Sequence, residues 1–264
     1  SLDALALESA KRLNEYLIKT WTAESGLPQN TINSLIQTHQ GYIWIGTPAG
    51  LVRFDGVRFK IFSRWNTSAL KNDRILALHE DKNNVLWIGT DGGGLCSFKN
   101  GAWRNYTTQD GLANNHVRAI TSDLRNNLWV GTEYGLNRLS ADGFQLYTTK
   151  DGLYDIIITA LAVDYWGNLW IGTMRGGLAR FEEEVAHVYD YKDGLLNMAV
   201  LSLSASRMGN LWIGTLEGLY SLDREKETVN SVPGTMYTPV TAILEDEQGA
   251  LWVGTMADGL KRMT

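Results

Sequence analysis

The chain offers few side chains whose types and spacing could support catalysis or metal binding. Its four histidines, His39, His79, His116 and His187, include no HxH or HExxH pair of the kind that holds a metal ion. The chain also lacks a G-x-S-x-G nucleophile elbow and a phosphate-binding loop. Cys96 is the only cysteine, and we expect it to pack as a small apolar residue. These observations predict a protein that is not an enzyme and has no metal or cofactor.

Carboxylates are the remaining candidates for catalysis. Asp91 with Glu133, or Glu217 with Asp258, could face one another across loops, although the sequence does not give their separation. Residues 164–170 (DYWGNLW) have a faint similarity to the Asp-box of sialidases, but they lie in a different hairpin and no arginine cluster accompanies them. A glycan-processing hydrolase or lyase is therefore the least favoured function.

The elements that must position any site follow from one repeated phrase. Trp-(Ile/Val)-Gly-Thr occurs six times, and successive tryptophans are 40 to 43 residues apart. A short β-rich unit with this period is typical of a radial repeat architecture, in which each unit packs on its neighbours. The repeated tryptophans are Trp44, Trp87, Trp129, Trp170, Trp212 and Trp252. The repeat sets the fold, so function must reside in what differs between copies.

The third copy shows the unit most clearly. Residues 115–123, 128–132, 135–139 and 144–149 form four predicted strands separated by turns, which together make one propeller blade. An aspartate such as Asp81 lies six residues before most of the repeated tryptophans, where we expect it to accept hydrogen bonds from turn amides. We expect the repeated glycine to lie where packed backbones approach closely, and the tryptophan to fill the wedge between blades.

The two ends of the chain predict how the ring closes. Trp21 and Leu27 have the spacing that an outer-strand aromatic and a following leucine have in other copies. Residues 16–24 are therefore predicted to form an outer strand, whereas the last copy ends on its third strand, residues 259–263. Pairing these two segments would close a six-bladed ring and cover both sheet edges.

Ahead of that strand, residues 2–14 have apolar side chains at helical spacing. The predicted fold is thus an all-β, six-bladed propeller of four-stranded antiparallel blades over residues 16–264, closed by an N-terminal strand. A short N-terminal helix within residues 1–15 precedes it. We expect this helix to pack on the underside of the propeller rather than to bind a membrane or a partner.

Two sets of loops are predicted to form one binding face. The loops that lead into an inner strand, and those that join the second and third strands, emerge at the same end of a propeller and vary between copies. Their amides, charges and tyrosines suit a small polar molecule such as an oligosaccharide; a partner protein or a second copy of the chain is the alternative. The candidate ligand-binding residues are Asn30, Arg74, Asp91, His116, Tyr134, Tyr154, Arg175, Asn197, Glu217 and Asp258.

The repeat resembles the two-component regulator propeller family. The fourth copy carries the features in residues 168–173 (NLWIGT), 176–181 (GGLARF) and 193–195 (DGL), and residues 26–30 (GLPQN) are similar to the usual entry sequence. The resemblance covers roughly residues 16–263. It implies a periplasmic or other extracytoplasmic sensor domain without catalysis, upstream of a membrane anchor and a signalling output module. Many relatives carry two propellers, so the six repeats are either a whole ring or part of a longer array.

Composition limits the partners that can be expected. The net charge is −5 and the sequence pI is about 5.4, so no basic field exists to attract nucleic acid. No apolar run approaches the roughly twenty residues that span a bilayer, so a membrane would be reached only through flanking segments. The chain begins with Ser1, which is expected of a processed or trimmed piece of a longer protein.

Overall fold

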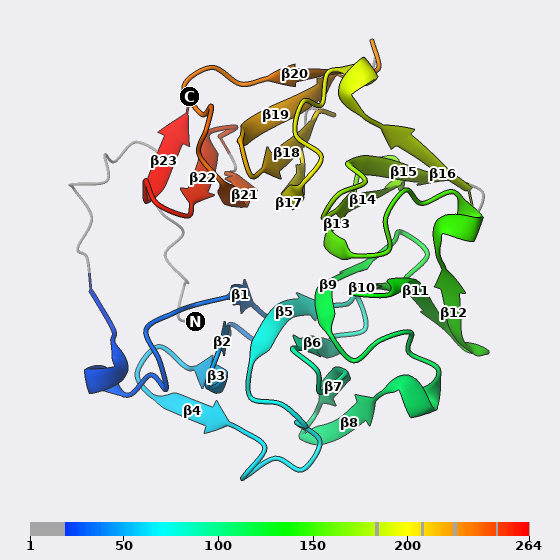
Figure 1. Ribbon diagram of the computed structural model, residues 1–264. Coiled ribbons are helices and arrows are strands. Elements are labelled where there is room, and N and C mark those ends of the chain that lie inside the picture. Colours follow the sequence, from blue (N-terminus) through cyan, green and yellow to red (C-terminus); the bar gives the residue numbers. More distant parts are fainter. Residues whose placement is uncertain (1–18, 183–184, 207–208, 224–225, 247, 264) are drawn as a thin grey trace.

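In the computed structural model of the protein, antiparallel sheets are arranged radially around an axis as the six blades of a propeller (Figure 1). The structure describes residues 19–182, 185–206, 209–223, 226–246 and 248–263. Within each sheet the strands follow one another in chain order, from an inner strand to an outer one. The predicted all-β propeller of antiparallel blades is confirmed.

The first three blades have four strands each. Blade one contains β1 (Ser34–Gln37), β2 (Ile43–Thr47), β3 (Gly50–Phe54) and β4 (Phe59–Phe62). Blade two contains β5 (Ile75–Glu80), β6 (Leu86–Thr90), β7 (Leu95–Lys99) and β8 (Ala102–Tyr106). Blade three contains β9 (Val117–Ser122), β10 (Leu128–Thr132), β11 (Gly135–Ser140) and β12 (Gly143–Tyr147), within two residues of the predicted strands.

The last three blades repeat this arrangement, except that blade six has three strands. Blade four contains β13 (Ile158–Val163), β14 (Leu169–Thr173), β15 (Leu178–Glu182) and β16 (Val185–Tyr189). Blade five contains β17 (Val200–Ala205), β18 (Leu211–Thr215), β19 (Gly218–Asp223) and β20 (Thr228–Ser231). Blade six contains β21 (Val240–Glu245), β22 (Leu251–Thr255) and β23 (Leu260–Met263).

The repeated aspartate shapes the turn between the first two strands of a blade. Asp81 Oδ1 accepts the backbone N–H groups of Asn83 (2.8 Å) and Val85 (3.0 Å), as predicted. Its second oxygen accepts the indole N–H of Trp87 at 2.9 Å, a bond that the sequence analysis did not foresee. The same indole bond occurs in blades three, four and six. One carboxylate therefore fixes both the turn and the ring that packs between blades.

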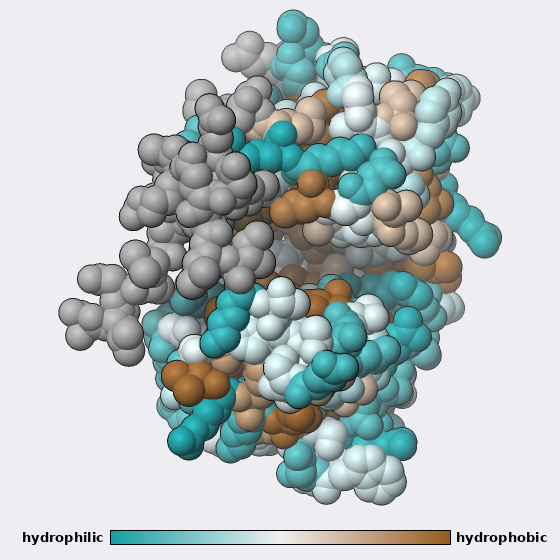
Figure 2. Space-filling model, turned by 90° about the vertical axis from the view of Figure 1, so that its left-hand side faces the viewer, coloured by the Kyte–Doolittle hydropathy of each residue, from teal (hydrophilic) through white to brown (hydrophobic). Residues whose placement is uncertain are grey.

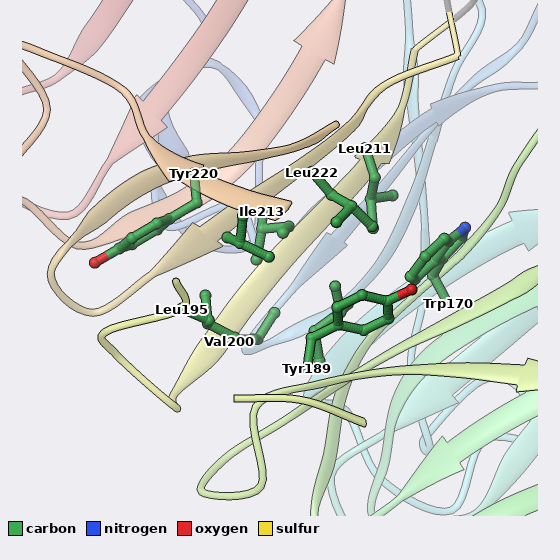
Figure 3. Close-up of a cluster of buried hydrophobic side chains, with 10 residues drawn as sticks. Trp170, Tyr189, Leu195, Val200, Leu211, Ile213, Tyr220 and Leu222 are labelled. Atoms are coloured by element: carbon green, nitrogen blue, oxygen red, sulfur yellow. The ribbon is translucent and has the colours of Figure 1, made fainter. Parts of the chain in front are cut away.

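The repeated glycine lies against the next blade, as predicted. A Cβ atom built on Gly172 would lie 2.5 Å from Val200 Cγ1 of blade five, and one on Gly131 would lie 2.6 Å from Ile158 Cγ2 of blade four. The tryptophan fills the wedge beside this contact. Trp170 is fully buried in a cluster that includes Leu211 and other side chains of blade five (Figure 3). Blade packing is thus close enough to exclude even a methyl group at the glycine.

The predicted closing strand is not found among the described residues. In the part of that segment that the structure covers, 19–24, there is no strand, and Ala23–Ser25 instead forms the 3₁₀ turn η2. Trp21 packs edge-on against Phe54 of blade one, with ring centroids 5.1 Å apart, and Leu27 is buried beside blade one. The closing strand is therefore not confirmed: residues 16–18 of it lie outside the described residues, and Trp21 and Leu27 contact blade one. The predicted helix in residues 1–15 lies outside the described residues.

The junction of blades six and one differs from the others. Within the described ranges, a Cβ on Gly254 of blade six would meet only Ala242 of its own blade, at 3.2 Å. Figure 2 shows this side of the molecule, where the surface is hollowed between the two blades.

No helix among the described residues is long and apolar enough to cross a membrane.

Candidate functional site

The two predicted sets of loops do emerge on one face of the propeller. In blades two to six, the residue after the repeated threonine donates its N–H to a backbone carbonyl at the entry to the same blade's inner strand. The bonds from Asp91 to Arg74 (2.9 Å) and from Met174 to Ile157 (3.0 Å) are examples. The predicted shared face is therefore confirmed, and we call it the axial mouth.

A threonine fastens the base of every loop between the second and third strands. The Thr132 hydroxyl donates to the carbonyl of Gly135 (2.9 Å) and accepts the N–H of Tyr134 (3.1 Å). The hydroxyl-to-carbonyl bond recurs in all six blades, at 2.7 to 3.0 Å. The loop residues are thus presented from a fixed backbone.

A cavity of about 370 Å³ lies on the axis at this mouth. Its wall includes Leu76, Arg118, Thr159 and Thr241, which come from the inner strands of four blades. Arg118 is the one charged side chain among the residues that line it. Its Nε donates to Glu133 Oε1 at 3.0 Å, and a second bond joins its Nη2 to the same oxygen. The cavity is therefore polar on one side and holds a fixed guanidinium.

Beside this pair, three of the predicted residues come together between blades two and three. Asp91 Oδ1 lies 2.7 Å from His116 Nδ1, and Asp91 Oδ2 lies 3.4 Å from Arg74 Nη1. The backbone of Asp91 is held by Asn72, whose side-chain N–H donates to its carbonyl at 2.6 Å. All three side chains are partly exposed. The cluster presents a guanidinium, an imidazole and a carboxylate in a fixed arrangement.

The predicted aromatic residues point to solvent. Tyr134 is 53% exposed and Tyr154 is 67% exposed, so both are available to a ligand at the axial mouth. Arg175 lies on the neighbouring loop, where its backbone N–H donates to Asp155 Oδ2 at 2.9 Å. These residues belong to blades three and four, beside the charged cluster.

Other predicted residues are engaged by their own surroundings. The side-chain oxygen of Asn30 accepts the N–H of Ala23 (2.7 Å), and that of Asn197 accepts the N–H of Ala199 (3.1 Å), so both shape turns. Glu217 is exposed on its loop. Asp258 accepts Lys261 Nζ (3.2 Å) and the Thr238 hydroxyl (3.0 Å). The Lys261 bond, together with the Thr238 bond, holds the pKa of Asp258 below its usual value.

The two carboxylates of the first suspected pair, Asp91 and Glu133, are each bonded to other groups. Asp91 contacts Arg74 and His116, and Glu133 contacts Arg118. Among the residues that the structure describes, no group of three or more His, Cys, Asp or Glu side chains could hold a metal ion.

Of two groups that could have been reactive, Cys96 is buried and His79 is partly buried. Cys96 donates its S–H to the carbonyl of Ala69, and burial raises the pKa of the thiol to about 11. The predicted packing role of Cys96 is therefore confirmed. His79 bonds to Ser122, and burial lowers the pKa of its imidazole. Neither group lines the axial cavity.

The axial residues were missed by the loop-based prediction. Arg118, Thr159 and Thr241 each directly follow a buried branched residue at the start of an inner strand. Each lies at a β-bulge, where an extra residue interrupts the alternation of the strand: Val117 pairs with Thr132 and Ala119 with Gly131, and Arg118 lies between them. All three residues line the axial cavity. The sequence signal that could have found them is the polar residue that follows a buried branched residue at the start of an inner strand.

Comparison with known proteins identifies a family whose repeats are similar to those of this chain. The family model described as "Two component regulator propeller" matches residues 26–49, 69–92 and 236–257, which confirms the resemblance. The extracellular domain of BT3049 from B. thetaiotaomicron, described as a hybrid two component system, is 26% identical with a TM-score of 0.82. That alignment covers 94% of this chain and 35% of that chain, so this chain spans about a third of its length. No curated protein matches the chain.

Two further similarities show the fold alone. The extracellular domain of BT4673 from B. thetaiotaomicron is 22% identical with a TM-score of 0.73, over 88% of this chain and 34% of that chain. Virginiamycin B lyase from Staphylococcus aureus, with quinupristin bound, is 15% identical with a TM-score of 0.73. It is covered over 82% of its length, and 89% of this chain is aligned. The same propeller therefore occurs in sensor-type and lyase proteins.

Proposed function

We propose that this chain, which carries two-component regulator propeller repeats, is an extracytoplasmic, non-catalytic sensor region that binds a small polar ligand at its axial mouth. The similarity to the extracellular domain of BT3049 supports a sensor role and a location outside the cytoplasm. The observation that carries the proposal is the polar arrangement around the axial cavity, where Arg118 and Glu133 lie beside the Arg74–Asp91–His116 cluster.

This arrangement suits an oligosaccharide. Hydroxyl groups can both donate and accept, so they match a site in which guanidinium donors, an imidazole and carboxylates are already oriented. Tyr134 and Tyr154 supply exposed aromatic faces on which a sugar ring can stack. Because the loops are fastened at their bases, little ordering would be needed on binding.

The contacts of the carboxylates favour binding over catalysis. A glycosidase needs two carboxyl groups facing the scissile bond at a defined separation. Asp91 and Glu133 are each bonded to a cationic side chain instead. They are therefore better placed to orient a ligand than to transfer a proton to it.

A protein partner is the second candidate, and exposed apolar side chains at the same mouth favour it. Tyr237 and Met256 lie on blade six loops and are mostly exposed, and Leu196 is exposed on the loop before blade five. Aromatic residues and methionine are enriched at protein interfaces. Such a partner would cover blades five and six, whereas the charged cluster lies at blades two and three.

Titration of oligosaccharides while following the melting temperature tests the proposal. A ligand at about 100 times its Kd stabilises the folded state by about 2.7 kcal/mol. We expect Arg118→Ala to abolish the shift, and Tyr165→Ala, an exposed change in a turn at the opposite end of blade four, to leave it intact. Turnover of a bound glycan, or an unchanged shift with Arg118→Ala, would contradict the proposal.

A further inference from the structure

A second cavity, of about 820 Å³, lies between blades three and four at the end of the propeller opposite the axial mouth. The turn residues Leu124 and Arg125 of blade three contribute to its wall, as do Arg138 on β11 and Phe181, Ala186 and His187 of blade four. These turns join first to second strands, so they lie away from the loops of the axial mouth. We call this cavity the blade three–four groove.

The groove lies where blade four lacks an aromatic side chain that three other blades carry. In three outer strands, the residue that pairs with this position of the third strand is aromatic: Phe59 pairs with Phe54, Trp103 with Phe98, and Phe144 with Leu139. In blade five this position is Val229, which pairs with Leu222. In blade four this position is Ala186, which pairs with Phe181. Three blades therefore place a large ring where blade four has a methyl group.

Where the ring is present, it fills the space between blades. Trp103 of blade two lies 4.6 Å from Phe98 and 5.3 Å from Phe62 of blade one, measured between ring centroids. Phe144 of blade three lies 5.8 Å from Tyr106 of blade two. The equivalent volume beside Ala186 is left as a cavity.

The apolar wall of the groove is already assembled to receive a ring. Phe181 packs against Trp129 (5.5 Å) and Tyr147 (4.9 Å) of blade three, so these rings are held in place. A preformed apolar space of this kind takes up aromatic molecules without large rearrangement. An incoming ring would restore the packing seen between blades one and two.

The charges around the groove favour an anion. Among the described residues of its wall, both carboxylates are engaged: Asp123 accepts from Asn127 and from the Trp129 indole, and Glu182 Oε1 lies 2.9 Å from Arg180 Nε. Arg125 is exposed at the rim, and the described residues give it no ion pair. A carboxylate bound here would meet a guanidinium in a partly enclosed site, where a charge-assisted hydrogen bond is strong.

We propose that the blade three–four groove binds a small aromatic carboxylate. Its ring takes the volume left by Ala186 and stacks against Phe181, and its carboxylate faces Arg125. The groove is separate from the axial mouth, so this proposal is tested independently of the function proposed for the mouth.

Calorimetric titration with indole-3-acetate, and with uncharged indole as its comparison, tests this site. We expect indole-3-acetate to bind more tightly than indole, and Arg125→Gln to weaken indole-3-acetate by about tenfold while leaving indole unaffected. Ala186→Trp, which copies the residue that blade two carries, should fill the space and weaken both probes by more than about tenfold.

Ala186→Ser is the matched control, because it leaves the space open and should bind as the unaltered chain does. Melting temperatures of all variants establish that they fold. Arg125→Gln changes an exposed side chain, so it remains informative if Ala186→Trp is not tolerated. Absence of indole-3-acetate binding at millimolar concentration, or undiminished binding to Ala186→Trp, would overturn the proposal. Loss of oligosaccharide binding at the axial mouth would have no bearing on it.

Discussion

The five junctions within the run of blades differ from the junction between blade six and blade one. At each of the five junctions between consecutive blades, a branched side chain from the start of an inner strand packs against the repeated glycine of the preceding blade. This side chain is 0% exposed. These residues are Ile75, Val117, Ile158, Val200 and Val240. At the sixth junction the equivalent residue is Ile32, which is 43% exposed.

The comparison shows that the same repeated residue is buried to different extents, depending on which blade lies against it. Ile32 precedes β1 as Ile75 begins β5, and Gly254 occupies the place of Gly214. In repeat proteins the stability of a unit resides largely in its interfaces with adjacent units. Matched substitutions at buried and exposed copies should therefore separate the contribution of the interface from that of the blade.

The largest difference is expected for the tryptophans. Trp170 is fully buried between blades four and five, so Trp170→Ala should lower the free energy of unfolding by about 3–5 kcal/mol. Trp252 of blade six is only partly buried, and Trp252→Ala should cost clearly less. Urea unfolding of both variants measures the difference. Equal losses would mean that the tryptophan acts within its own blade.

A smaller difference is expected for the branched residues. Ile158→Ala removes a fully buried side chain and should cost about 2–5 kcal/mol, whereas Ile32→Ala should cost a minor part of that. Thermal unfolding followed by tryptophan fluorescence compares the two. If Ile32→Ala were as damaging as Ile158→Ala, Ile32 would be buried against another surface in solution.

The glycines give the reverse test, in which a methyl group is added. Gly172→Ala would bring a Cβ to 2.5 Å from Val200, and we expect this overpacking to cost about 1–3 kcal/mol. Gly254→Ala would bring a Cβ to 3.2 Å from the Cβ of Ala242, a tight contact that a small shift relieves, so we expect a cost clearly smaller than that of Gly172→Ala. Melting temperatures that fall equally in both variants would show that Gly254 is also covered.

The smallest effect is a pH dependence at blade six. The hydrogen bond from the Trp252 indole, with those from turn amides, holds the pKa of Asp246 below its usual value. The carboxylate therefore stabilises the fold at neutral pH, and this contribution is lost as the pH falls through the lowered pKa of the folded state. The melting temperature of Asp246→Asn should lie below that of the unaltered chain at about pH 7, and the gap should narrow towards about pH 3. A constant gap would exclude this linkage.

The features that recur in every blade could be predicted from the sequence. Asp81 and Gly172 have roles that depend on contacts within one repeat or between consecutive repeats, so their spacing reveals them. The 3₁₀ turn Ala23–Ser25 was not predicted, although it and the equivalent turn Thr108–Asp110 are followed by the same glycine and leucine.

The features that the sequence could not predict depend on which surface lies opposite. Trp21 has the spacing of an outer-strand aromatic, but its partner turned out to be Phe54 of blade one. The groove beside Ala186 depends on an absent side chain, which no motif marks. Of the candidate site, the shared face of Asp91 and His116 followed from the loops, whereas the axial position of Arg118 depends on a β-bulge that no motif marks.

The threonine hydroxyl that bonds across the base of each mouth loop has a consequence for how this protein could change. Since Thr132 and its equivalents bond only to backbone groups, they keep their partners whatever side chains the loop carries. A loop of equal length could be transplanted from one copy to another, or replaced during evolution, without unsettling the strands beneath it. New recognition could therefore be acquired one blade at a time.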